Sequence, residues 1–120
     1  MSWQYSQSSG ILMYTGNVIH WTGYSGKGSD KNDPLMADFP FWGPIPLGTY
    51  RMRLVPHAVF KHPAFLLIPE GHDAHHRTDF WIHGESAQSF GDSSRGCIIL
   101  PPNVRNKILS YKNDLLEVVP

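Results

Sequence analysis

The chain has 120 residues, of which 41% are hydrophobic and 17% are charged. This length supplies one hydrophobic core but not two, and the composition is typical of a globular chain rather than a disordered one. Ten basic and ten acidic residues give a formal net charge of zero at pH 7. We therefore expect one domain over residues 1–120 and no binding of nucleic acid through bulk charge.

The single cysteine excludes an intrachain disulfide. No apolar stretch approaches the ~20 residues that cross a bilayer as a helix, so we expect no membrane span. The first ten residues lack the basic and apolar regions of a Sec signal. We expect a protein that is made in the cytoplasm without a Sec signal, and a target outside it would require another export route.

Apolar runs and period-2 alternation predict about seven strands. In the clearest one, Tyr50, Met52 and Leu54 alternate with Arg51 and Arg53. A hairpin is expected where Gly16 or Asn17 supplies the positive φ of the turn. A weaker alternation surrounds Trp3 and Tyr5. The expected strands cover residues 11–14, 18–21, 49–55, 65–68, 80–82, 98–100 and 115–119.

One helix is expected after Pro101 and Pro102, because proline is tolerated in the first helical turn. Its expected apolar face contains Val104, Ile108, Leu109 and Tyr111. About seven strands and one C-terminal helix predict a mainly β domain, either a β-sandwich or a barrel with the helix packed against it.

Two polar segments interrupt the strand pattern. Residues 23–34 are rich in glycine, serine and aspartate and form either a flap beside a cleft or a solvated connector. Residues 71–77 contain His72, Asp73, His75 and His76, which are potential zinc ligands. Adjacent histidines on an irregular loop point in different directions, and no H-E-x-x-H pattern is present. We favour a polar loop near the substrate, and expect no metal or other cofactor.

The most informative segment runs from His83 to Cys97. His83 ends one apolar run, and Cys97 begins another fourteen positions later. A polar, glycine-bearing loop between two short strands can bring their ends together at one edge of a sheet. An imidazole beside a thiol, whose ordinary pKa is about 8.5, raises the fraction of nucleophilic thiolate. The spacing therefore predicts a cysteine–histidine catalytic pair.

The glycines beside this pair fit the same chemistry. Gly96 lets a substrate carbonyl approach the backbone closely, and the N–H groups of Gly96 and Cys97 are expected to face an oxyanion. The carbonyl of Gly84 is expected to fix the tautomer of His83. The alternative is that Cys97 is a small buried side chain at the start of a core strand.

These residues resemble a known family. His83-Gly84 followed by Ser94-Arg95-Gly96-Cys97-Ile98 is similar to the histidine-glycine and serine-histidine-glycine-cysteine signature of L,D-transpeptidase catalytic domains. The run 43–50 resembles that family's proline-glycine strand entry. With the short length, the pattern is most similar to L,D-transpeptidase effectors of type VI secretion systems, over residues 10 to 101.

The resemblance implies a cysteine-dependent L,D-carboxypeptidase or L,D-transpeptidase that acts on the stem tetrapeptide of peptidoglycan. Cys97 would be the nucleophile and His83 the base. It also implies secretion into the periplasm of target bacteria and a cognate immunity protein as partner.

Ser94 and Arg95 are the expected substrate-binding residues. Arg95 stands where the wider family has a second histidine, and its guanidinium cannot act as a base at neutral pH. It could bind the terminal carboxylate of D-Ala, lower the thiol pKa, or form a structural salt bridge with Asp92 or Glu85.

Two other readings remain open on the sequence. A sortase-like transpeptidase also places histidine before cysteine, but it requires a wider gap and a later arginine on a neighbouring strand, for which only Arg105 is available. A non-catalytic β-domain that binds glycan or peptide would leave Cys97 buried and unreactive.

Overall fold

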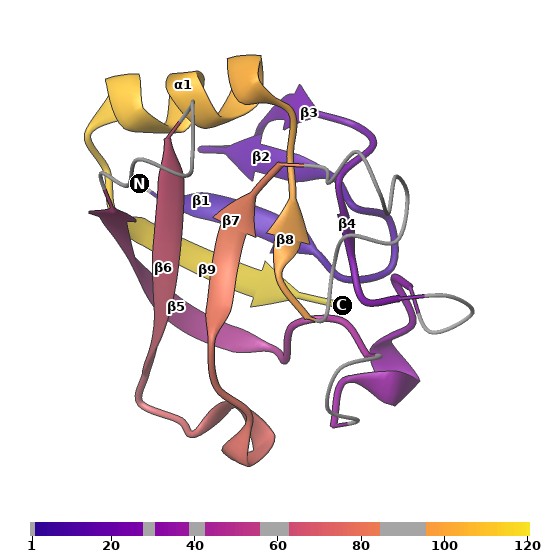
Figure 1. The fold of residues 1–120 in the computed structure, drawn as a ribbon. Helices are drawn as coiled ribbons and strands as arrows, with labels where there is room; N and C mark the ends of the chain where they lie inside the picture. Colours follow the sequence, from indigo (N-terminus) through magenta and orange to yellow (C-terminus); the bar gives the residue numbers. More distant parts are fainter. Residues whose placement is uncertain (1, 28–30, 39–42, 56–62, 85–95) are drawn as a thin grey trace.

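The computed structural model describes residues 2–27, 31–38, 43–55, 63–84 and 96–120. Within these ranges the chain forms nine strands and one α-helix (Figure 1). The elements are β1 (Trp3–Ser6), β2 (Leu12–Tyr14), β3 (Asn17–His20), β4 (Tyr24–Ser25), β5 (Gly48–Val55), β6 (Ala64–Glu70), β7 (Phe80–His83), β8 (Ile98–Ile99), α1 (Pro102–Tyr111) and β9 (Leu115–Val119), with short 3-10 helices at Pro34–Met36 and Ala74–His76.

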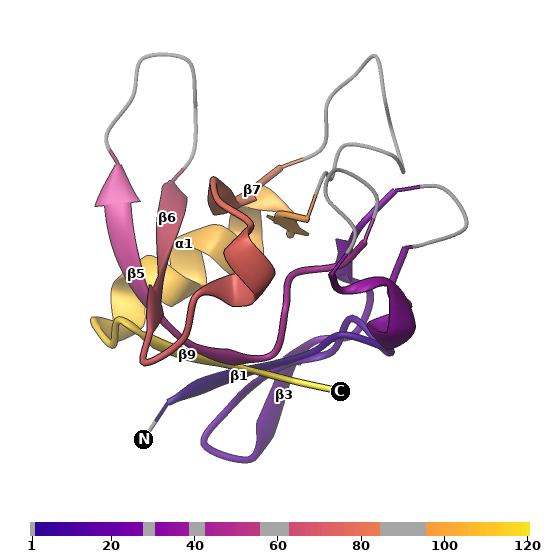
Figure 2. The ribbon, with the colours of Figure 1, turned by 90° about the horizontal axis from the view of Figure 1, so that it is seen from below.

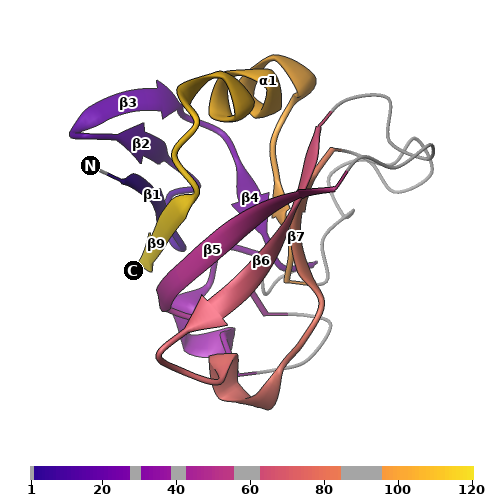
Figure 3. The ribbon, with the colours of Figure 1, turned by 90° about the vertical axis from the view of Figure 1, so that its left-hand side faces the viewer.

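All nine strands belong to one sheet in the order β3-β2-β1-β9-β5-β6-β7-β8-β4. The pairs β1/β9 and β7/β8 are parallel, and the other pairs are antiparallel. Figures 2 and 3 show the sheet curling into a half-barrel, with α1 across one end. The expected mainly β domain with one C-terminal helix is therefore confirmed, as a single curled sheet.

The predicted hairpin forms between β2 and β3, with one correction to its turn. Thr15 and Gly16 have φ values of 49° and 81°. Asn17 instead begins β3 and pairs with Tyr14. Glycine adopts positive φ without steric cost, so Gly16 supplies the conformation that the turn requires.

Alternation along the central strands places one face in the core. Tyr50 and Met52 of β5 are buried and Arg51 and Arg53 are exposed, as their spacing predicts, but Leu54 is 42% exposed. On neighbouring β9, Leu116 lies opposite Tyr50 and has no exposed surface. The strands β1, β6, β7 and β8 add buried side chains to the same cluster.

The helix is confirmed, but its buried face differs from the prediction. Its first residue is Pro102, and its buried residues are Val104, Arg105 and Ile108. Leu109 and Tyr111 are each 40% exposed. Arg105 is thus buried on the inner face of the helix, whereas Leu109, which the hydrophobic pattern placed there, is partly exposed.

Replacing Leu116 with alanine tests the central position of β9. Removal of a fully buried leucine side chain loses about 2–5 kcal/mol of unfolding free energy, through lost burial and an unfilled cavity. Urea denaturation followed by circular dichroism measures the loss. The matched control is Leu109→Ala, which removes the same atoms from a 40% exposed helix position. Equal effects of the two substitutions would contradict this placement of the core.

Candidate thiol–imidazole site

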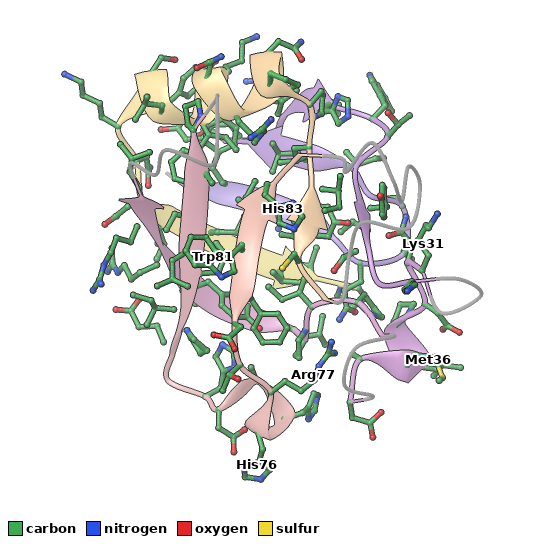
Figure 4. All side chains as sticks on the ribbon, viewed as in Figure 1. Lys31, Met36, His76, Arg77, Trp81 and His83 are labelled. Atoms are coloured by element: carbon green, nitrogen blue, oxygen red, sulfur yellow. The ribbon has the colours of Figure 1, made fainter. Side chains whose placement is uncertain are left out.

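His83 ends strand β7, and Cys97 directly precedes β8, the strand parallel to it. In the register of β7 and β8, Ile82 pairs with Ile98, and both are fully buried. Side chains alternate between the two faces of a strand. His83 follows Ile82 and Cys97 precedes Ile98, so both side chains leave the sheet on the face opposite to these isoleucines. The imidazole and the thiol are therefore diagonal neighbours on one face, and Figure 4 labels His83 near the end of β7.

The imidazole of His83 is oriented by the next residue. Its Nδ1 lies 2.8 Å from the carbonyl oxygen of Gly84. A carbonyl only accepts hydrogen bonds, so Nδ1 donates and Nε2 of the neutral ring is left as a proton acceptor. Burial, the largest cause, lowers the pKa of His83, and the charge of Arg105 lowers it further, while the bond to Gly84 raises it. The ring is therefore neutral at pH 7, in the tautomer that a general base requires.

The sulfur of Cys97 faces the backbone at the start of β7. It lies 3.6 Å from the carbonyl oxygen of Asp79. Burial is the largest influence and raises the pKa of the thiol to about 11. A hydrogen bond with the backbone of Trp81 and the charge of Arg77 lower the pKa, and Asp79 raises it. The resting pair is thus a thiol and a neutral imidazole, which differs from the expected rise in thiolate because burial outweighs the opposing contributions.

Gly96, which directly precedes the cysteine, is fixed from two sides. Its φ of 111° favours glycine. Its carbonyl oxygen accepts a hydrogen bond of 3.0 Å from the hydroxyl of Ser25, which in turn accepts one of 2.7 Å from the N–H of Ile45. A side chain at position 96 would collide with the guanidinium of Arg77.

Gly84 has a similar neighbour. A Cβ at this position would lie 2.6 Å from Nη2 of Arg105. Arg105 is 6% exposed, and its Nη1 donates a 3.1 Å hydrogen bond to the carbonyl of Pro63. Because Arg105 lies on α1, it does not provide the strand arginine that the sortase-like reading requires.

The sequence interpretation missed Ser25 and Arg77 next to the site, and it considered Arg105 only as the arginine of a sortase-like site. Each acts through partners that are distant in the sequence, such as the 71 positions between Ser25 and Gly96. No local pattern carries such information. Arg77 also ends the histidine-rich segment 71–77, in which only the histidines and Asp73 were considered as functional residues.

The segment 23–34 is partly an edge strand rather than a flap or connector. Tyr24 and Ser25 form β4 and pair with Ile99 and Ile98 of β8. The N–H of Ser25 donates to Oδ1 of Asn32 at 2.9 Å. The beginning of this segment therefore supports the strand that follows the cysteine.

Two predicted residues, Ser94 and Arg95, lie outside the described residues, as do Glu85 and Asp92. Their expected roles stay predictions. The catalytic roles expected for Cys97, His83, Gly84 and Gly96 also stay predictions, although these residues are described.

In the histidine-rich loop, the ring nitrogens of His72 and His76 interact with neighbouring groups of the protein. His72 has Nε2 at 3.0 Å from the carbonyl of Thr49, and its Nδ1 accepts from the N–H of Ala74 at 3.1 Å. His76 pairs with Asp73 at 3.0 Å on the surface, pointing away from β7 in Figure 4. Among the described residues, no group of three histidine, cysteine or acidic side chains could hold a metal ion.

Comparison with known proteins gives one match. The family model of the Tlde1 domain matches residues 19–117, which is most of the chain. No curated protein and no solved structure matches. Within the described part of the chain, no helix is long and apolar enough to cross a membrane. The chain belongs to the Tlde1 domain family, a family of type VI secretion effectors.

Proposed function

We propose that this chain is a cysteine-dependent L,D-carboxypeptidase and L,D-transpeptidase that acts on the stem tetrapeptide of peptidoglycan. The observation that carries the proposal is the arrangement of Cys97 and His83. His83 ends β7 and Cys97 directly precedes the parallel strand β8, on the same face, and the imidazole is in the tautomer that accepts a proton. Membership of an effector family supports an activity directed at other cells.

In the proposed reaction, the sulfur of Cys97 attacks the carbonyl between the L-centre of diaminopimelate and the terminal D-Ala. Nε2 of His83 takes the thiol proton and gives it to the leaving amine of D-Ala, so that a thioester and free D-Ala result. Water then hydrolyses the thioester, or the amine of another D-amino acid attacks it and gives exchange. Because the resting thiol is protonated, the transfer to His83 accompanies the attack.

The N–H groups of Gly96 and Cys97 are proposed to stabilise the tetrahedral oxyanion. Residues 1–120 form the proposed catalytic domain, Ser94 and Arg95 its proposed substrate contacts. Shortened or exchanged stem peptides weaken the wall of a competing bacterium. This target places the proposed action in the periplasm and calls for a cognate immunity protein in the producing cell.

One observation favours a second candidate, a non-catalytic β-domain that binds peptide or glycan. Burial raises the thiol pKa to about 11, which is typical of an inert cysteine. Such a domain would bind the disaccharide tetrapeptide in calorimetry but release no D-Ala. The proposed enzyme releases D-Ala from the same ligand.

Replacing Cys97 with alanine is expected to abolish release of D-Ala, because no other group provides the proposed nucleophile. The unfolding free energy should change by no more than about 1–2 kcal/mol, since one sulfur atom opens only a small cavity. Mass spectrometry of disaccharide tetrapeptide products measures the activity, and thermal denaturation provides the folding control. Release of D-Ala by a folded Cys97→Ala variant would refute the cysteine mechanism.

The acid limb of the pH profile reports on His83. Its pKa is lowered by burial, so the ring stays neutral until the pH falls below the ordinary histidine value of about 6.5. We expect kcat/KM to be constant near pH 7 and to fall only below pH 6.5, as His83 gains a proton. Initial rates between pH 4.5 and 8.5 test this range. An acid limb centred above pH 6.5 would contradict a neutral, desolvated base.

A further inference from the structure

We propose that Arg77 is a positioning residue for Cys97, which holds the backbone before the sulfur and supplies a fixed positive charge to the anionic sulfur. Only the consequence of this charge for catalysis rests on the proposed function. The effect on the sulfur is a property of the folded chain and is measured without any peptidoglycan substrate.

The guanidinium of Arg77 is held in a cage of backbone carbonyls. Its Nη1 donates to Ala37 at 2.6 Å and to Pro44 at 2.8 Å, and its Nη2 donates to Gly43 at 3.1 Å. The side chain is 8% exposed. The planar fork of donors therefore ties Ala37, Gly43 and Pro44 to the residues that precede β7. Figure 4 shows Arg77 near the start of this strand.

The other side of the guanidinium faces the residue before the nucleophile. It leaves no room for a Cβ at Gly96, and the ring of Phe80 lies 3.0 Å from where that Cβ would be. The guanidinium carbon is itself 5.2 Å from the centre of the Phe80 ring. With Ser25 bonded to its carbonyl, Gly96 is therefore confined between a hydroxyl and a guanidinium. This confinement fixes the backbone from which the Cys97 side chain projects.

The guanidinium of Arg77 occupies the place of a Cβ at Gly96, so its positive charge lies beside the residue that directly precedes Cys97. Carbonyl acceptors are neutral, so hydrogen bonds with them leave a positive charge in place, and arginine stays protonated even when it is buried. Charges interact more strongly in a poorly solvated environment than in water. In agreement with this geometry, Arg77 lowers the pKa of Cys97, and Cys97 raises that of Arg77.

Other groups contribute to the field around the pair. Asp79 raises the pKa of Cys97, whereas the backbone of Trp81 lowers it. Burial is the largest influence on Arg77 and lowers its pKa, whereas Tyr50, Cys97 and Asp38 raise it. At the end of β7, the charge of Arg105 lowers the pKa of His83. Among the described residues, Arg77 is thus the cation that lowers the pKa of the thiol, and Arg105 is the one that lowers the pKa of the imidazole.

The test compares two alkylating reagents of similar size and different charge. Iodoacetate is anionic and iodoacetamide is neutral. The rate of Cys97 alkylation by iodoacetate divided by the rate with iodoacetamide therefore reports the local charge, and a nearby cation raises this ratio. The parent is an Arg95→Gln variant, which removes the arginine two positions before the cysteine. Arg77→Gln and Arg77→Lys are compared in this parent. The matched control is Arg51→Gln. Arg51 lies on β5, which β6 and β7 separate from β8, and it is paired with Glu70 and Asp114.

We expect the rate ratio to fall about three- to tenfold in Arg77→Gln. It should return toward the parent value in Arg77→Lys and stay unchanged in Arg51→Gln. Lysine keeps the charge but loses the fork, so a purely structural role would affect both Arg77 variants alike. An unchanged ratio in folded Arg77→Gln would overturn the proposal.

If neither Arg77 variant folds, the parent protein still provides a test. The rate ratio is measured in the folded parent and in the same protein unfolded in urea at equal pH and ionic strength. The proposal requires a higher ratio in the folded chain. An equal or lower folded ratio would overturn it, and this result would leave the proposed release of D-Ala to be judged by its own assay.

Discussion

The parallel pairing of β7 with β8 is the constraint on which the site depends. It brings together residues fourteen positions apart and sets them on one face, because Ile82 and Ile98 occupy the other face in the core. A slip of one residue would turn the thiol or the imidazole toward the core, since side chains alternate along a strand. β8 has only two residues, so β4 and the hydrogen bond from Ser25 to Gly96 help to secure its register.

The same burial that fixes this register sets the chemistry of the pair. Desolvation raises the pKa of Cys97 and lowers that of His83, so the folded chain favours two neutral groups over an ion pair. In the proposed reaction, the nucleophile forms when the thiol proton moves to Nε2 of His83 during the attack. Two buried arginines lie beside the two glycines of the site, and Arg77 opposes the effect of burial on the thiol.

Local patterns in the sequence predicted much of the fold. Alternation around Tyr50 identified β5, Gly16 identified the hairpin turn, and Pro102 identified the start of α1. The two-residue strand β4 was not predictable, because it exists only through pairing with β8. The burial of Arg77 and Arg105 beside the site was also not predicted. Their acceptors, which are Pro63 for Arg105 and Ala37, Gly43 and Pro44 for Arg77, are set by the tertiary fold.

The candidate pair itself was predictable because both residues are marked locally, each by an apolar run and an adjacent glycine. What the sequence did not contain was the protonation state. An imidazole near a thiol suggested a raised fraction of thiolate. The burial of the Cys97 thiol, which opposes this effect, depends on how the whole sheet curls (Figure 3).

The most direct measurement is the mass of the intact protein after brief incubation with disaccharide tetrapeptide and quenching in acid, which preserves thioesters. The account predicts an adduct equal to the substrate minus D-Ala, located on the peptide that contains Cys97. Release of D-Ala in the first turnover with no adduct, or with an adduct on another residue, would contradict it.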